Sequence, residues 1–334
     1  MATISDVSRI AGVSKATVSR VINGTGQVKE STRELVRSVM HELNYKPSSV
    51  AQALATKSGN SIGLVLSDFT GSYFGILLKQ ASVSADCMRK QLLIADGHNQ
   101  AESELKAVHS LVEKKCDVIV LYSRMLSSEQ IIALNQSIDI PLVNVGRQLP
   151  SDAGYSIAFD QKNAIKMAVD HLIDLGHRDI TYIGPKPVTP TSISRSQGFT
   201  DAIKSHSHLT IDTRKLTCEF GFIEGYAAGK EFAKQKRLNT SIVAASDDIA
   251  TGCIKALTEE GIHVPNDVSI ISIDNDPYSA FIEPALTTVE VPIKSIMAQA
   301  MLVAQKMIEG NDSTQPEILC GQLIVRSSTR PATL

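Results

Sequence analysis

The sequence lacks the features that direct a chain into or across a membrane. It opens with no charged, apolar leader ending in small residues, so we expect no secretory signal. Its longest apolar runs, such as Ile62–Leu66 and Val118–Tyr122, are far shorter than the roughly 20 residues that span a bilayer. The five cysteines form no C-x-x-C pair, and an odd number favours reduced thiols. These absences predict a cytoplasmic protein with no membrane partner.

Catalytic and metal-binding motifs are also missing. We find no G-x-G-x-x-G after a strand, no Walker A motif, no H-E-x-x-H and no G-x-S-x-G. The eight histidines show no metal-ligand spacing. Asp274 and Asp276 could be the paired carboxylates of a glycosidase, but no acid/base pair of set separation accompanies them. The sequence therefore predicts no enzymatic activity, no metal site and no cofactor.

The first 58 residues are the most informative part of the chain. Thr3, with Asp6 three residues later, predicts a capped helix that Gly12 ends, because glycine adopts positive φ freely. Ser14 is expected to cap a second helix, whose inward residues are Val18, Val21 and Ile22. Its outward residues are Lys15, Ala16, Thr17 and Arg20. This arrangement is a helix-turn-helix, whose second helix fits the major groove of DNA.

A third helix should follow. Ser31 and Glu34 form an S-x-x-E pattern that predicts a capping box opening this helix. The helix should run through Leu43 and bury Leu35, Val39 and Leu43.

Net charge distinguishes a DNA-binding head from a three-helix bundle that binds no ligand. Residues 1–58 hold eight Lys or Arg and four Asp or Glu, a net charge of +4. The whole chain has a net charge of −2, so residues 59–334 carry −6. A basic head on an acidic body is the electrostatic pattern expected of a DNA-binding module.

From Ser61 onward, short β-branched runs alternate with helical segments. The expected strands are Ile62–Leu66, Leu92–Ala95, Val118–Leu121, Leu142–Val145, Ile180–Ile183, Ile242–Ala245 and Ser269–Ile273. The expected helices include Ala101–Glu113, Asn163–Leu175, Ile223–Gln235 and Ile249–Glu260. This alternation predicts an α/β fold of parallel sheets covered on both faces, and it is too long for one sheet. We therefore expect two subdomains with a cleft between them.

The sequence divides into three parts. Residues 1–47 form the predicted helix-turn-helix domain, residues 48–58 a short helix or linker, and residues 59–334 the core. The chain is expected to recross between subdomains near Pro292 and Gly321. The subdomains would then be residues 60–160 with 292–322, and residues 161–291 with 323–330.

Two segments carry a family resemblance. IAGVSKATVSRVIN, which ends at Asn23, and YKPSSVAQALATKS, from Tyr45 to Ser58, resemble the LacI/GalR family of bacterial repressors. The segments Arg89–Gly97, Cys116–Ser127 and Pro190–Ile193 are most similar to the galactose and aryl-β-glucoside operon repressors. The resemblance implies a hinge helix after the head and a core like that of periplasmic sugar-binding proteins.

The resemblance also implies DNA contacts and a partner. A homodimer would place two heads on a palindromic operator, and the short helix Ser48–Ala55 would fold there as a hinge. Leu54 would wedge into the minor groove and kink the duplex, although a linker leucine facing the core is the alternative. The candidate DNA-binding residues are Thr3, Ser14, Lys15, Ala16, Thr17, Arg20, Asn23 and Leu54.

Candidate effector contacts follow the expected strands, because ligands bind at the carboxyl ends of strands in such sheets. A sugar needs bidentate partners for its hydroxyls, such as Arg195 and Asp274, and an apolar surface, such as Phe74 and Phe220. The resemblance places Arg195, Phe220, Ser246 and Asp274 on effector-contact positions, although the family often has asparagine where this chain has Ser246. The candidates are Tyr73, Phe74, Arg147, Arg195, Phe220, Ser246, Asp247 and Asp274.

Three alternatives stay open for these residues. Asp247 and Asp248 could simply cap the following helix. Tyr73 and Phe74 could be aromatics that pack a helix. Arg195, in a loop after a strand, could pair only with a neighbouring carboxylate.

Together these observations predict a sequence-specific DNA-binding transcriptional repressor. A small sugar or β-glucoside-like effector would switch its operator affinity. The sequence leaves open which sugar acts and whether it releases or recruits DNA. A pure sugar-binding protein is the alternative, but it would not explain the basic head.

Overall fold

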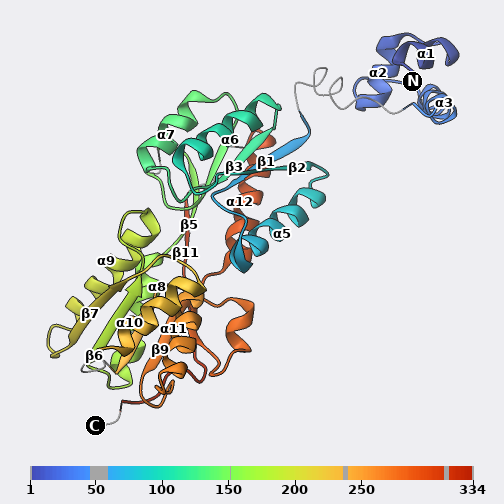
Figure 1. The fold of residues 1–334 in the computed structure, drawn as a ribbon. Coiled ribbons are helices and arrows are strands. Elements are labelled where there is room, and N and C mark those ends of the chain that lie inside the picture. The colour runs from blue at the N-terminus through green and yellow to red at the C-terminus, as the bar shows by residue number, and fades with distance from the viewer. Residues whose placement is uncertain (1, 46–58, 151, 236–239, 312–315, 333–334) are drawn as a thin grey trace.

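A computed structural model describes residues 2–45, 59–150, 152–235, 240–311 and 316–332. These residues form an N-terminal helical head and a core of two six-stranded sheets with helices around them (Figure 1). The predicted hinge helix Ser48–Ala55 and its Leu54 lie outside the described residues.

The head consists of α1 (Ile4–Ile10), α2 (Lys15–Asn23) and α3 (Glu30–Glu42). Thr3 and Asp6 form the expected capping box, and the Ser14 hydroxyl accepts a hydrogen bond from the backbone N–H of Thr17. Gly12, between the first two helices, has φ of 62°, a left-handed conformation that glycine adopts without strain. The three helices share a small buried core of Val7, Ala11, Val18, Val21, Val36 and Val39. The predicted helix-turn-helix is confirmed.

The predicted start and inner face of the third helix are wrong in detail. The N-cap is Lys29 and no side chain caps the helix, so Ser31 and Glu34 form no capping box there. Leu35 is 48% exposed, whereas Val36 is buried. Both residues fit a helical period that continues to Val39 and Leu43, so spacing alone could not choose between them.

The first sheet is entirely parallel and has the strand order β11-β5-β4-β3-β1-β2. Its strands are β1 (Ser61–Leu66), β2 (Gln91–Asp96), β3 (Val118–Tyr122), β4 (Leu142–Gly146), β5 (Tyr155–Phe159) and β11 (Glu317–Leu319). Its helices are α5 (Gly71–Cys87), α6 (Ala101–Glu113), α7 (Ser128–Ser137) and α12 (Ile293–Ile308). We call this unit the first lobe.

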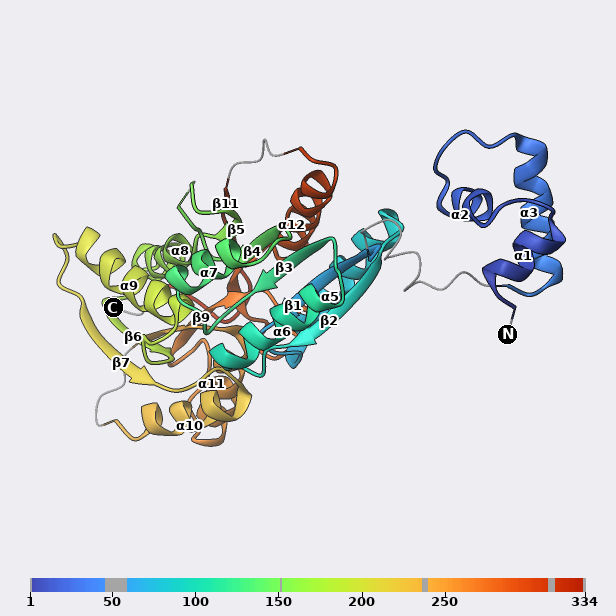
Figure 2. The same ribbon diagram turned by 90° about the horizontal axis from the view of Figure 1, so that it is seen from above.

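The second lobe is built the same way, with the strand order β12-β10-β9-β8-β6-β7. Its strands are β6 (Asp179–Gly184), β7 (Asp212–Thr217), β8 (Ser241–Ala244), β9 (Ser269–Asp274), β10 (Thr287–Glu290) and β12 (Gln322–Ile324), of which only β12 runs antiparallel to its neighbour. Its helices are α8 (Gln161–Asp174), α9 (Pro190–Ser205), α10 (Phe222–Ala233), α11 (Asp247–Glu259) and the short η1 (Pro277–Ala280). Helix α8 packs against α9, and α10 packs against α11 (Figure 2).

All seven predicted strands and all four predicted helices are present, with ends shifted by at most two residues. The two-lobed α/β fold with parallel sheets is therefore confirmed. Strands β5, β7, β10, β11 and β12 were not predicted. Strand β7 gives no apolar signal, because its sequence DTRKLT is polar and its residues lie mostly exposed at the edge of the sheet.

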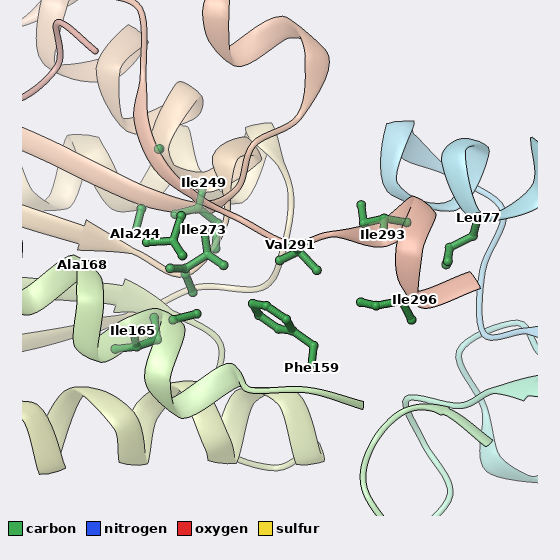
Figure 3. Close-up of a cluster of buried hydrophobic side chains, with 14 of the residues drawn as sticks. Leu77, Phe159, Ile165, Ala168, Ala244, Ile249, Ile273, Val291, Ile293 and Ile296 are labelled. Carbon is green, nitrogen blue, oxygen red and sulfur yellow. The ribbon is translucent and has the colours of Figure 1, made fainter. Parts of the chain in front are cut away.

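Three chain segments join the lobes. They lie between β5 and α8, between β10 and α12, and between β11 and β12. Phe159, the last residue of β5, and Val291, just after β10, are buried between the apolar residues of the lobes, with Ile293 on one side and Ile273 on the other (Figure 3). Gly321, on the third segment, lies so close to the Glu290 carbonyl oxygen that a Cβ would approach it to 2.7 Å. The connection between the lobes is thus a packed apolar hinge.

His177 ties the C-terminal segment to the second lobe. Its ring is buried, with Nδ1 2.9 Å from the Thr240 hydroxyl and Nε2 3.0 Å from the Arg330 carbonyl oxygen. Burial lowers the pKa of His177 below its ordinary value of 6.5, because the charged imidazolium would lose its hydration.

This histidine should make the fold sensitive to acid. Below about pH 6.5 the unfolded chain binds a proton that the folded His177 resists, so the free energy of unfolding should fall as pH drops. We expect His177→Ala to cost about 1–3 kcal/mol at pH 7.5, because it leaves buried polar partners unpaired. Urea unfolding of the natural chain and of His177→Gln, at pH 7.5 and 5.5, tests the linkage. An equal loss of stability on acidification in both proteins would contradict it.

Candidate functional site

A cavity of about 680 Å³ lies between the two lobes, at the carboxyl ends of their strands. We call it the cleft. The first lobe contributes Tyr73, Phe74, Tyr122 and Arg124, and the second contributes Arg195, Phe220, Ser246 and Asp274. Six of the eight predicted effector-contact residues therefore line one cavity.

The centre of the cleft is a buried ion pair. The Arg195 guanidinium lies 3.2 Å from an Asp274 carboxylate oxygen, and the two side chains are 4% and 11% exposed. Arg195 also donates to Gln161 Oε1 at 2.7 Å and to the Ala245 carbonyl oxygen. These bonds hold the guanidinium rigidly at the cavity wall.

Arg195 reaches the cleft from a helix rather than from the loop that the sequence indicated. A capping box formed by Thr189 and Ser192 opens helix α9, and Pro190 occupies its first turn, where its missing N–H costs nothing. The predicted loop therefore ends before Pro190, and Arg195 lies in the second helical turn. A helix positions a side chain more precisely than a free loop.

Asp274 has unusual backbone and electrostatic surroundings. Its φ is 129°, a conformation that non-glycine residues rarely adopt and that often marks a functional site. Burial is the main cause that raises the pKa of its carboxyl to about 8, with Asp247 and Asp276 adding to the shift and Arg195 opposing it. A carboxyl in this setting can accept or donate a hydrogen bond to a hydroxyl.

Aromatic rings form the apolar side of the cleft. Phe74 packs edge-on against Tyr73 and Tyr122, with ring centroids 5.5 Å and 5.7 Å away. Arg124 lies over the Phe74 ring at 4.8 Å and within 5.7 Å of the Phe220 ring from the other lobe. Tyr73 and Phe74 lie on helix α5, where they pack against the first lobe, and both also line the cleft.

Among the described residues, a hydrogen bond and a cation–ring contact bridge the lobes at the cleft. The Ser72 hydroxyl of the first lobe donates to an Asp276 carboxylate oxygen of the second at 2.5 Å. Arg124 and Phe220 form the other contact. Sequence reasoning did not single out Arg124, although it follows strand β3 by two residues, at the strand end where the other candidates were sought.

Two predicted residues do not line the cleft. Asp247 is fully buried and accepts hydrogen bonds from Ser272, from Thr288 and from the backbone N–H of Asp276. Because the carboxylate is used there, Asp247 positions the chain after β9 instead of facing a ligand. It is also not the helix cap, since Ser246 caps α11 while lining the cleft. Arg147 donates to the Leu126 and Ser123 carbonyl oxygens and lines a separate cavity.

The second helix of the head presents the predicted DNA-reading residues. Lys15, Ala16 and Arg20 are exposed, and no ion pair recorded among the described residues involves either cation. The hydroxyls of Thr3, Ser14 and Thr17 take part in the helix caps, and Asn23 donates to Ser19 at 3.2 Å. The exposed face of α2 is therefore free to meet a groove.

Within the described ranges, no group of three or more histidine, cysteine, aspartate or glutamate side chains is arranged to hold a metal ion. None of the described helices is both long and apolar enough to cross a bilayer.

Known proteins match both parts of the chain. Residues 3–48 match the family of bacterial regulatory proteins described as the lacI family, and residues 169–329 match a periplasmic binding protein-like domain. The transcriptional regulator AscG of Escherichia coli is 35% identical over 98% of each chain. The regulator GalR of the same species is 33% identical over 91% of this chain and 88% of its own. A crystal structure of the lac repressor dimer bound to operator and an anti-inducer has a TM-score of 0.88, with 25% identity over 98% of this chain and 99% of its own.

Proposed function

Because the chain belongs to the LacI family of bacterial transcriptional regulators, we propose that it represses transcription as a homodimer on a palindromic operator, under control of a small sugar or glycoside. The observation that carries the effector proposal is the buried Arg195–Asp274 pair facing aromatic rings across the cleft. Paired polar groups suit the hydroxyls of a sugar, and the rings suit its C–H face.

The relatives support this proposal. AscG and GalR are named as transcriptional regulators rather than enzymes, and we propose that this chain also has no enzymatic activity. A solved structure described as a sugar-binding transcriptional regulator of the LacI family, from Escherichia coli, is 30% identical over 82% of this chain and all of its own, with a TM-score of 0.73. A polyhydroxylated effector fits both that description and the chemistry of the cleft.

The fold suggests how a sugar would act at a distance. A ligand in the cleft touches both lobes, so its binding favours one relative position of the lobes about the hinge at Phe159 and Val291. The first lobe starts at Ser61, just after the linker to the head, and its position sets the spacing of the two heads in a dimer. Linkage then requires that operator and effector change each other's affinity by the same factor.

A ligand screen tests the effector proposal. We expect a neutral mono- or disaccharide, or an aryl glucoside, to raise the melting temperature of the full chain, since a ligand that binds only the folded state stabilises it. The same ligand should change the affinity of the protein for operator DNA in a fluorescence-anisotropy titration. A ligand that stabilises the protein but leaves operator affinity unchanged would contradict the proposed switch.

Leu54 is proposed as the wedge that bends the operator. Leu54→Ala should weaken specific binding and reduce the bend, because an inserted apolar side chain unstacks one base step. Effector binding should stay at the natural level, since the cleft is far along the chain in another domain. A circular-permutation gel shift measures the bend, and an unchanged angle would contradict the role of Leu54.

A further inference from the structure

A second cavity of about 350 Å³ adjoins the cleft. Tyr122, Gln161 and Thr191 line both cavities, so the two cavities share a border between the lobes. Gln161 stands at this junction, and its side-chain oxygen is held by Arg195 at 2.7 Å. A ligand that contacts Arg195 would therefore lie next to Gln161 and beside the second cavity, which we call the basic chamber.

The two cavities differ in charge. The cleft is lined by five carboxylates and three cations: Asp68, Glu219, Asp248, Asp274, Asp276, Arg124, Lys186 and Arg195. The basic chamber is lined by two cations, Arg147 and Lys162, and by one carboxylate, Asp160. Asp160 is the N-cap of α8, and its carboxylate accepts a hydrogen bond from the backbone N–H of Asn163 at 2.9 Å. The basic chamber is thus the part of the site suited to negative charge.

Arg147 is a half-buried cation that forms no ion pair with any residue that the structure describes. Its guanidinium donates to the Leu126 and Ser123 carbonyl oxygens, and its Nε has no hydrogen-bond partner. Glu104 and Glu129 act on it through space, but no carboxylate among the described residues lies within ion-pair distance. Burial is the main cause that lowers the pKa of Arg147. A partly buried guanidinium has lost part of its hydration, and a bound anion that replaces this hydration stabilises its charge.

Two helices add to the positive potential. Helix α8 begins at Gln161 and α9 at Pro190, and residues in the first turn of each line the basic chamber. The N-terminus of a helix carries a partial positive charge and attracts anions. Lys162 lies on one of these first turns, exposed at the chamber, with only a loose 3.9 Å contact to Asp201.

We propose that the basic chamber binds a phosphate-like oxyanion through Arg147 and Lys162. The oxyanion is either the phosphate of a sugar phosphate whose hydroxyls reach Arg195 and Asp274, or a free phosphate ion beside a neutral sugar. This inference rests on the proposed function for the part of the site that binds the sugar. It predicts that a phosphorylated sugar binds more tightly than the corresponding neutral sugar.

Paired probes test the proposal on the full chain. Galactose and galactose 6-phosphate, and salicin and salicin 6-phosphate, are titrated by calorimetry in a phosphate-free buffer, together with inorganic phosphate alone. We expect at least one phosphorylated sugar to bind ten-fold or more tightly than its neutral partner. Lys162→Ala and Arg147→Gln should each reduce that advantage at least three-fold. Glutamine is chosen because it can keep a hydrogen bond to the loop carbonyls while removing the charge.

The control removes a cation from the same helix outside the chamber. Lys166 lies one turn after Lys162 on α8 and pairs with Asp170, so Lys166→Ala should keep the full phosphate advantage.

Inorganic phosphate that binds the natural chain and loses affinity in Lys162→Ala would support the chamber as a site for the free ion. Suppose that a neutral sugar binds, that its phosphorylated form binds no more tightly, and that inorganic phosphate does not bind. The proposed oxyanion site is then wrong, while the proposed function stands. If Lys162→Ala and Lys166→Ala weaken phosphate binding equally, the chamber is likewise overturned. Failure of every sugar and sugar phosphate would instead overturn the proposed function.

Discussion

A chain in which Arg195 or Asp274 is replaced by alanine should bind its operator and no longer respond to sugar. Arg195 supplies charged donors and Asp274 a carboxyl at the centre of the cleft, and hydrogen bonds to charged groups are worth about 1.5–3 kcal/mol. Their loss should weaken sugar binding by a factor of about 10 to 150. The head has its own core and does not use the cleft, so its contacts with DNA should persist.

The measurement is a fluorescence-anisotropy titration of labelled operator with and without sugar. Removing Arg195 leaves Asp274 buried without its partner, so the thermal stability of each variant must be compared with that of the natural chain. Asp274→Asn keeps the shape of the side chain and serves as the milder variant. Lys204→Ala removes an exposed cation from the same helix, α9, and should respond to sugar normally. A variant that responds at the natural sugar concentration would show that the effector binds elsewhere.

The fold was predictable because its signals are local and repeated. The buried strands of parallel sheets are continuous apolar runs, and Ile62–Leu66 and Val118–Leu121 are fully buried, as expected for such runs. The head was predictable because the caps at Thr3 and Ser14 and the turn at Gly12 are each set by neighbouring residues. Edge strand β7 was missed because an exposed edge needs no apolar run.

The site was predictable only as far as strand ends locate it. Arg195, Phe220, Ser246 and Asp274 line one cavity, since each lies at the carboxyl end of a strand of one sheet or on the loop or helix that follows it. The direction of a side chain is decided by its three-dimensional neighbours, which a strand-end rule does not describe. Asp247 turns inward because Ser272 and Thr288 on adjacent strands offer hydroxyls, and Arg147 turns toward two loop carbonyls. Neither choice is visible in spacing along the chain.

Arg147 shows that a departure from expectation can itself be informative. The strand-end rule predicted Arg147 in the cleft, but the residue lines the neighbouring basic chamber. No carboxylate of the described residues pairs with it there. The oxyanion that we propose for the basic chamber would supply the negative charge that Arg147 lacks there.

Arg20→Ala should have the largest effect on DNA recognition. Val18 and Val21 bury one face of α2 and thereby turn the exposed Arg20 outward, where its guanidinium can form two hydrogen bonds with the major-groove edge of a guanine. We expect the variant to lose about 1–3 kcal/mol on the cognate palindrome, which is a factor of about 5 to 150, and much less on random DNA. Lys15 and Ala16 lie on the same face, and Ala16 could contact a thymine methyl group.

The natural chain, Arg20→Ala and the control Arg9→Ala are compared on both DNAs by anisotropy at several salt concentrations. Arg9 is an exposed cation on α1 whose loss removes the same charge from the head without touching α2. A residue that contacts only phosphate lowers affinity for all sequences alike and reduces the salt dependence, whereas a base contact lowers affinity chiefly on the cognate site. Equal losses on both DNAs would assign Arg20 to the phosphate backbone. A loss confined to the palindrome would instead place α2 in the major groove with Arg20 reading its sequence.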